Sequence, residues 1–137
     1  MRKVKMIVWC GLAMCFLLAP VRGNAAEGKE PYKIGSIFSY TGPGAFLGDR
    51  MKTTVEMMVE SMNKKGGIDG HPIQLTVYDA ASEATKAVMA ANRLITQDKV
   101  DIISGTGNMS GISLALKPVA NRNKIPMISN CGALAIV

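Results

Sequence analysis

Four segments of the chain carry the apolar pattern of β-strands. The first, over 33–40, mixes apolar and small residues and stops at a Thr-Gly-Pro-Gly turn signal at 41–44. In the second, over 72–78, apolar and polar residues alternate, so we expect one partly wet face and a position near a sheet edge. Two shorter apolar runs predict strands over 100–104 and 125–129.

Helical spacing appears between these strands. The segment from about 48 to 64 repeats apolar residues at steps of four, three and four, a stripe that we expect to pack into the core. Its members are Met51, Val55, Met58 and Met62. A second helix is expected to start with Ser82 as its N-cap and to run to about Ile95, with alanines that let it lie close against a sheet.

A third helix is expected to begin at Ser110 or Ser113 and to end at Asn123. The order of elements is then β-α-β-α-β-α-β, which predicts a doubly wound α/β lobe: a parallel sheet with helices on both faces. In such sheets ligands bind beyond the carboxyl ends of the strands, where strand-to-helix loops gather. These loops are expected at 41–49, 79–82, 105–111 and 130–133.

The first 26 residues have the pattern of a cleavable secretion signal. A short basic segment precedes an almost uninterrupted apolar run over 6–20, and small residues follow, which places cleavage after Ala25 or Ala26. At about 1.5 Å per residue, a helix of that length is shorter than a hydrocarbon core of about 30 Å, so a permanent membrane span is disfavoured. The signal peptide is therefore assigned to 1–26 and the mature chain to 27–137.

A lipoprotein anchor is the alternative for this leader, because Cys15 follows an apolar stretch. The bulky Met14 in front of it and the apolar run beyond it speak against that reading. We expect the mature protein to be periplasmic and not embedded in the membrane.

Most of the excess positive charge belongs to the leader. The chain has 16 Lys and Arg and 10 Asp and Glu, but four of the basic residues precede the cleavage site, which leaves 12 basic against 10 acidic residues. This balance gives no indication of a nucleic-acid partner. Cys131 is the single cysteine of the mature chain, so no internal disulfide is possible, and we expect a small buried apolar side chain rather than a reactive thiol.

The expected loops are poor in catalytic groups. The chain has one histidine, in front of the second strand, and no nucleophile elbow, Walker motif or metal-spaced His/Cys set, so we expect no enzyme activity and no cofactor. Asp79 and Glu83 are interpreted as turn and cap residues rather than an acid-base pair. Loop 105–111 offers the hydroxyls of Thr106 and Ser110 at a helix start, which favours a carboxylate or a zwitterion.

Five motifs follow the leader in a familiar order. They read KIGSIFSYTGPGAFLGD, NKKGGIDGHPIQLTVYDAAS, AVMAANRLI, VDIISGTGNMSG and NKIPMISNCGA. Together they resemble the N-terminal lobe of the type I periplasmic binding proteins of the leucine/isoleucine/valine class, the solute receptors of branched-chain amino acid ABC transporters. The resemblance extends over essentially the whole mature segment.

The resemblance implies a ligand site, in which Ser110 is similar to a serine that hydrogen-bonds the ligand carboxylate. Gly111, next to it, is assigned to the same site. Cys131 matches a residue whose backbone carbonyl takes the ligand ammonium. Ala133 stands where leucine-binding members often have a hydroxyl, and Leu47 where they commonly have an aromatic ring, so the identity of the solute stays open.

The implied function is solute binding for an ABC permease by closure of two lobes, with an amino acid or related small molecule as the solute. A ligand-sensing domain of a signalling receptor is the alternative, and a secreted α/β hydrolase is the rival among enzymes. Because this family needs a hinge and a second lobe, we expect the sequence to be an incomplete N-terminal lobe. Residues 27–137 alone are expected to fold poorly or to aggregate, since a sheet edge and helix faces stay uncovered.

Overall fold

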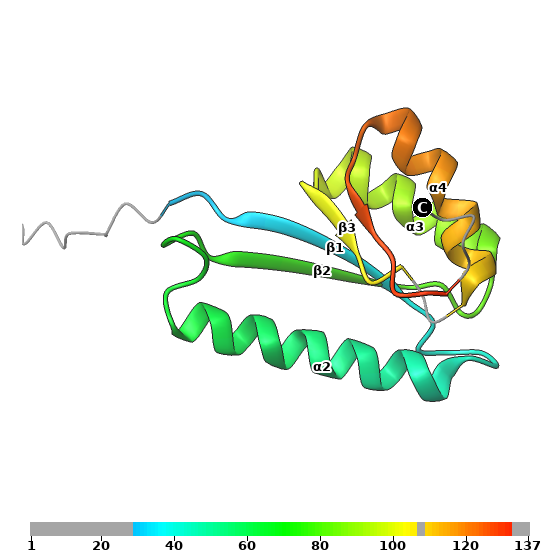
Figure 1. Cartoon of the computed structure of the whole chain (residues 1–137), viewed down its shortest axis with the longest axis horizontal. Coiled ribbons are helices and arrows are strands. Elements are labelled where there is room, and N and C mark those ends of the chain that lie inside the picture. Colours follow the sequence, from blue (N-terminus) through cyan, green and yellow to red (C-terminus); the bar gives the residue numbers. More distant parts are fainter. Residues whose placement is uncertain (1–28, 107–108, 133–137) are drawn as a thin grey trace, which may run out of the picture.

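A parallel sheet runs through the middle of the molecule in the computed structural model, which describes residues 29–106 and 109–132 (Figure 1). Among these residues the sheet has four strands in the order β2-β1-β3-β4. The strands are β1 (Tyr32–Phe38), β2 (Ile73–Asp79), β3 (Ile102–Ser104) and β4 (Met127–Ile128).

The pairing of the strands is uneven. β1 and β2 pair over their full length, from Tyr32 opposite Ile73 to Phe38 opposite Asp79. β3 pairs with β1 over three residues, and β4 pairs with β3 over two. β2 is an edge strand of this sheet, as its alternating pattern predicts.

Helices cover both faces of the sheet (Figure 1). α2 (Ala45–Lys64) lies along one face, over β1 and β2. α3 (Ala84–Arg93), continued by the π-helical turn η2 (Leu94–Asp98), and α4 (Ser110–Asn123) lie together on the other face. The predicted doubly wound α/β lobe is therefore confirmed.

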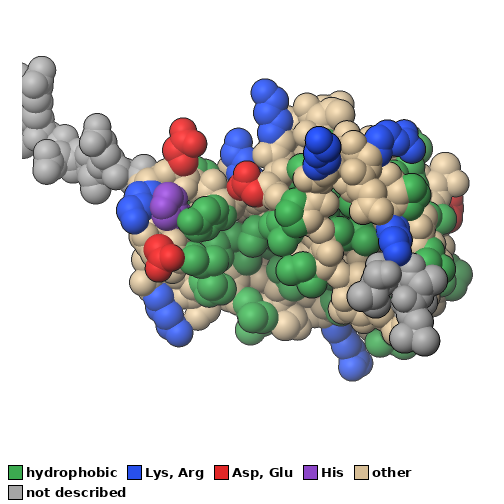
Figure 2. Space-filling view, turned by 45° about the horizontal axis from the view of Figure 1, so that its top comes forward, with side chains coloured by type: hydrophobic (Ala, Val, Ile, Leu, Met, Phe, Trp, Pro, Cys, Tyr) green, Lys and Arg blue, Asp and Glu red, His purple; other side chains and the backbone are tan. Residues whose placement is uncertain are grey.

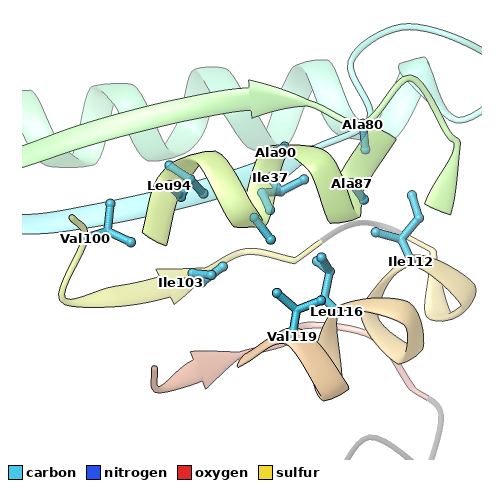
Figure 3. Packing of buried hydrophobic residues seen from close by; sticks show 11 residues of the cluster. Ile37, Ala80, Ala87, Ala90, Leu94, Val100, Ile103, Ile112, Leu116 and Val119 are labelled. Atoms are coloured by element: carbon cyan, nitrogen blue, oxygen red, sulfur yellow. The ribbon is translucent and has the colours of Figure 1, made fainter. Parts of the chain in front are cut away.

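The main core lies between the sheet and the pair α3 and α4 (Figure 3). Small side chains on α3, such as Ala87 and Ala91, are fully buried and let the helix approach the strands closely. The core cluster consists of Ile37, Ala80, Ala87, Ala90, Ala91, Leu94, Val100, Ile103, Ile112, Leu116 and Val119. It joins β1, β3, α3 with η2, and α4 into one apolar unit, together with Ala80 after β2 and Val100 before β3.

The methionine stripe of α2 is much less buried than the sequence predicts. Met58 is 58% exposed and Met62 is 36% exposed, and Gly48 is the one buried residue of this helix. The prediction that the stripe is core was wrong for these two residues, because α2 has no neighbouring helix on its face among the described residues. Figure 2 shows apolar side chains gathered across the middle of one face, with charged side chains around them.

None of the helices in the described ranges combines the length and the hydropathy needed to cross a lipid bilayer. The expected signal peptide at 1–26 lies outside the described residues.

Candidate functional site

The strands end together at one edge of the sheet, and the loops that follow them form the candidate site. All four strands are parallel, so their carboxyl ends share this edge. The described parts of these loops are 39–44, 80–83, 105–106 and 129–132. Three of them lead into the first turns of α2, α3 and α4. The predicted gathering of loops is thus present.

Asp79, the last residue of β2, ties two of these loops together. Its Oδ1 accepts hydrogen bonds from the backbone N–H groups of Ala81 (2.8 Å), Tyr40 (3.1 Å) and Thr41 (3.4 Å). Its Oδ2 accepts a hydrogen bond from the Thr41 hydroxyl. Burial acts to raise the pKa of the Asp79 carboxyl, but the Thr41 hydroxyl and these N–H groups outweigh it, so the pKa lies below its ordinary value. The turn role predicted for Asp79 is confirmed.

Ser82 does not cap α3, contrary to the prediction from its position. The N-cap is Glu83, and it makes no side-chain cap hydrogen bond. The Ser82 hydroxyl instead accepts from the Gly44 N–H (2.9 Å) and donates to the Thr41 carbonyl (3.2 Å). Its backbone is left-handed, with φ of 62°, which turns the side chain away from the helix and toward the first loop.

A second set of polar groups lies beneath the start of α4. The Ser113 hydroxyl is fully buried and donates to the Thr106 carbonyl. The Ser129 hydroxyl donates to Ser113 Oγ at 3.0 Å, and the Cys131 thiol donates to the same atom at 2.8 Å. The Thr106 hydroxyl, expected to face a ligand, is also fully buried, 3.2 Å from Ser113 Oγ. These hydrogen bonds therefore join the loop after β3 and the loop after β4 to α4.

Cys131 sits in a more polar place than predicted. It is half-buried, and its Sγ lies 2.6 Å from Ser129 Oγ as well as 2.8 Å from Ser113 Oγ. A buried apolar role was expected for it. Sequence reasoning missed both partners. Ser113 comes from α4 and meets Cys131 only in the folded chain, whereas Ser129 lies two residues before Cys131 in the same loop.

Ser110 and Gly111 form the first turn of α4. Ser110 is half-buried and Gly111 is exposed. A Cβ atom at Gly111 would meet nothing within 4 Å among the described residues, so there is room beside this glycine. The Ile112 and Ser113 N–H groups donate to the Met109 carbonyl. The first N–H groups of a helix, here those of Ser110 and Gly111, have no acceptor one turn earlier in the helix and carry partial positive charge, an arrangement that suits a carboxylate.

Leu47 lies in the first turn of α2 and is 45% exposed. α2 and α4 cover opposite faces of the sheet (Figure 1). Leu47, in the first turn of α2, and Ser110, in the first turn of α4, therefore belong to helices on opposite sides of the sheet. The structure thus brings Ser110, Gly111 and Cys131 near one helix start and places Leu47 across the edge from them. Ala133 lies outside the described residues.

An apolar cavity of about 330 Å³ opens between α2 and the ends of β3 and β4. Its lining includes Phe38, Met51, Gly105, Ile128 and Asn130, and we call it the edge cavity. Asn130 Nδ2 lies 3.8 Å from Met51 Sδ, which joins the loop after β4 to α2. Sequence reasoning missed these residues, although Asn130 adjoins Cys131 and Met51 lies one helical turn beyond Leu47.

The described residues bring no three His, Cys, Asp or Glu side chains into a metal-binding group. The polar side chains in this region include hydroxyls, the Cys131 thiol, the Asp79 carboxylate, and the Asn130 amide and Arg50 guanidinium that line the edge cavity. This arrangement can bind a small molecule through hydrogen bonds and apolar contact.

Comparisons with known proteins agree with this picture. The family model described as periplasmic binding protein matches residues 31–135. A Leu/Ile/Val-binding protein homolog 7 from Brucella suis is 35% identical over 118 residues, which are 86% of this chain and 29% of the relative. The Leu/Ile/Val-binding protein BraC3 of Rhizobium johnstonii is 34% identical over 96 residues, 70% of this chain and 26% of that protein.

Solved structures show the same likeness. LivJ, the branched-chain amino acid transporter substrate binding protein from Streptococcus pneumoniae in complex with isoleucine, matches with a TM-score of 0.69 and 32% identity, over 72% of this chain and 28% of LivJ. A solute binding protein of an ABC transporter from Rhodopseudomonas palustris, in complex with 3,4-dihydroxy benzoic acid, matches with a TM-score of 0.65 and 27% identity, over 72% and 26% of the two chains.

The chain spans less than a third of the length of the curated relatives that it matches. Within that span, the family match covers most of the described residues and the order of strands and helices fits the solved relatives. The chain therefore belongs to the type I periplasmic binding proteins of the branched-chain amino acid class.

Proposed function

We propose that this chain forms part of the first lobe of an exported receptor that binds an amino acid or a related carboxylic acid and delivers it to an ABC permease. The observation that carries the proposal is the open first turn of α4 at the carboxyl edge of the sheet. Ser110 is half-buried there, and Gly111 is exposed, with no heavy atom of the described residues within 4 Å of where its Cβ atom would lie. A solute carboxylate fits this position because of the helix dipole and the N–H groups of the first turn.

The solved relatives support a carboxylate as the common feature of the solute. One is in complex with isoleucine and another with 3,4-dihydroxy benzoic acid, and both of these compounds are carboxylic acids with different apolar parts. In this chain we assign the carboxylate to Ser110 and Gly111, the ammonium to the Cys131 carbonyl, and the apolar part to the side of Leu47. Ala133 is assigned to the same site.

The finer parts of the proposal concern the intact receptor. The relatives are more than three times as long as the segment matched here, so a hinge, a second lobe and contacts to a permease belong to regions beyond that segment. Closure of two lobes over the solute is the expected mechanism, in which the solute stabilises the closed state. The leader at 1–26 is proposed to direct export to the periplasm.

Export is tested by locating and sequencing the mature amino terminus. Expression with the native leader in a Gram-negative host should give a periplasmic protein that begins at Ala26 or Glu27. A product that keeps residues 1–26 and stays in the cytoplasm would remove the export part of the proposal and leave the binding part standing.

Binding is tested by NMR titration of the isotope-labelled intact receptor, which detects weak complexes. Leucine, isoleucine and 3,4-dihydroxy benzoic acid should shift the amide signals of Ser110 and Gly111, whereas leucinol, which lacks the carboxylate, should not. Ser110→Ala should weaken binding by roughly 1.5 to 3 kcal/mol, the range for hydrogen bonds to a charged group. Ser61→Ala, at an exposed position on α2, is the matched control.

Two results would contradict the assignment. If leucinol shifts the same signals as leucine, the first turn of α4 does not hold a carboxylate. If Ser110→Ala binds the solute as tightly as the Ser61→Ala control, Ser110 does not contact the solute. Leu47→Trp adds a separate measurement: it should change the preference among apolar side chains and spare the carboxylate contact, and a uniform loss for all solutes would remove Leu47 from the site.

A further inference from the structure

We propose that Asp79 and Ser82 are positioning residues of the solute site, which hold the loop 40–44 and, through it, the Leu47 side chain that sets solute preference. Neither residue is placed in contact with the solute. The inference rests on the proposed function for its consequence in binding, but its structural part can be measured without any solute.

The Asp79 carboxylate and the Ser82 hydroxyl hold the loop 40–44 through hydrogen bonds from a different segment of the chain. Asp79 accepts from the N–H groups of Tyr40 and Thr41 and from the Thr41 hydroxyl. Ser82 takes the Gly44 N–H and donates to the Thr41 carbonyl. Residues about 40 positions apart in sequence are thereby joined at both ends of the loop, where otherwise two parallel strands simply end.

The turn between Asp79 and α3 has an unusual backbone conformation. Ala81 and Ser82 both have positive φ, at 48° and 62°, although neither is glycine. Such conformations are unfavourable for residues with a Cβ atom and persist where surrounding contacts enforce them. Here the Asp79 carboxylate binds the Ala81 N–H, and the Ser82 side chain makes two bonds of its own. The strained pair aims the Ser82 hydroxyl at the loop.

The loop 40–44 lies close to the Ala81–Ser82 turn. A Cβ atom at Gly42, which has φ of 77°, would lie 2.6 Å from the Ala81 carbonyl oxygen. The backbones of the two loops are therefore in direct contact, and any shift of the Ala81–Ser82 turn is passed to the loop that faces it.

Backbone hydrogen bonds connect the loop 40–44 to the first turn of α2, where Leu47 lies. The Ala45 N–H donates to the Gly42 carbonyl at 3.1 Å, and the Leu47 N–H donates to the Gly44 carbonyl at 3.2 Å. The start of α2 thus uses carbonyl groups of the held loop as its first acceptors. If the loop moves, this turn and the Leu47 side chain move with it.

The consequence for binding is selective. Ser110 and Gly111 stand on α4, on the other face of the sheet, and the serine and cysteine cluster beneath them shares no hydrogen bond with Asp79 or Ser82 among the described residues. Loss of the Asp79 and Ser82 contacts should therefore alter the hold on the solute side chain and leave the hold on its carboxylate in place.

The structural arm of the test compares Asp79→Ala, Ser82→Ala and the double variant with the unmodified protein, all in the intact receptor. Amide hydrogen exchange at Tyr40, Thr41 and Gly44 should become roughly tenfold faster or more, and the Leu47 methyl signals should shift. Amides of β1 should keep their protection. Asp79→Asn keeps one carbonyl acceptor and should restore much of the loop protection, whereas Glu83→Gln, at the exposed neighbour of Ser82, should change nothing.

The binding arm measures the ratio of affinities for leucine and alanine. In Asp79→Ala this ratio should fall by roughly tenfold, and Asp79→Asn should recover part of it. An equal loss for both solutes would indicate a merely structural role and overturn the inference. Unchanged exchange at Tyr40 and Gly44 in the double variant would overturn it as well.

The two proposals fail in different ways. If the unmodified chain binds no carboxylic acid, the proposed function fails, and the exchange arm still decides whether Asp79 and Ser82 hold the loop. If the unmodified chain binds leucine but the variants keep its solute preference, the proposed function stands and the positioning role is lost.

Discussion

The two faces of the sheet are built from helices with similar apolar patterns, yet they differ greatly in burial. On the face of α3 and α4, Leu94, Ile103 and Leu116 are at most 1% exposed (Figure 3). On the face of α2, Met58 and Met62 remain exposed to solvent. An apolar stripe on a helix therefore shows which side turns inward, while the degree of burial depends on the neighbours that the fold supplies.

The difference comes from helix pairing. α3 and α4 pack against each other as well as against the sheet, whereas α2 lies over β1 and β2 without a second helix beside it in the described residues. A groove of about 230 Å³ follows α2 along the sheet, lined among others by Ile34, Leu75, Val55 and Met58. This open face supports the expectation that residues 27–137 alone unfold without a sharp cooperative transition, which calorimetry can check.

The largest expected effect tests the well-packed face. Leu94→Ala should lower the free energy of opening of the core by about 3 to 5 kcal/mol, because it leaves a cavity among fully buried side chains. Hydrogen exchange of the β1 and β3 amides in the intact receptor measures this. Met58→Ala is the matched change on the other face, with an expected loss below about 1 kcal/mol. Equal losses of stability in Leu94→Ala and Met58→Ala would contradict the difference in burial between the two faces.

Gly48→Ala tests the one tight contact of the α2 face. A Cβ atom there would lie 1.9 Å from the Ser39 carbonyl oxygen, so the helix would have to move away from the end of β1. We expect a loss of about 1 to 3 kcal/mol, even though alanine favours helix by about 1 kcal/mol. Gly111→Ala, at a helical glycine whose Cβ atom would meet nothing within 4 Å, is the control and should be neutral or stabilising by up to about 1 kcal/mol. A stabilising Gly48→Ala would contradict the observed contact.

Asn63→Ala tests how α2 is fastened to the edge strand. The Asn63 side chain accepts from the Ile73 N–H at 2.7 Å and donates to the Ile73 carbonyl at 2.8 Å. Its removal should destabilise the pairing of α2 with β2 by about 1 to 3 kcal/mol and speed exchange of the Ile73 amide. Asn92→Ala on α3, where the exposed side chain makes no such pair of bonds, should have little effect.

Acidification should have the smallest effect on stability, and it should act on the loop 40–44 and the Ala81–Ser82 turn, which Asp79 joins. The pKa of Asp79 is lower in the folded chain than in the unfolded one, so its contribution to stability is present above about pH 4 and is lost as the pH falls through the folded value. Exchange at Tyr40 and Thr41 should rise in that window before the core opens. In Asp79→Asn this early step should be absent, and its persistence would assign it to another group.

The strands next to the edge of the sheet were predictable almost to the residue. The segments 33–40 and 72–78 correspond to Tyr32–Phe38 and Ile73–Asp79, because each carries a strong local pattern and ends at a turn. β3 and β4 are shorter than predicted, since their length depends on pairing with a neighbour rather than on local apolar runs. α2 begins at Ala45 rather than near Gly48, because Ala45, Phe46 and Leu47 are all compatible with a helix.

The candidate site was only partly predictable. A helix start at Ser110 follows from local sequence, and the structure places it at the carboxyl edge. The distant partners of Cys131 and of Ser82 were not predictable, because Ser113 and Gly44 lie on other elements and meet these residues only through the tertiary fold. The contact of Ser129 with Cys131 is local, since the two residues are two positions apart in one loop.

The way in which the chain enters the sheet has a practical consequence. Lys29 lies at the amino end of β1, where its Nζ donates to the Asp69 carbonyl at 2.6 Å in the turn that leads into β2. This is the edge of the sheet opposite to the loops that follow the strands (Figure 1). A tag, a dye or a sensor surface attached ahead of Lys29 would therefore stand on the far side from Ser110 and Leu47. Immobilisation through the amino terminus would leave the recognition loops facing the sample.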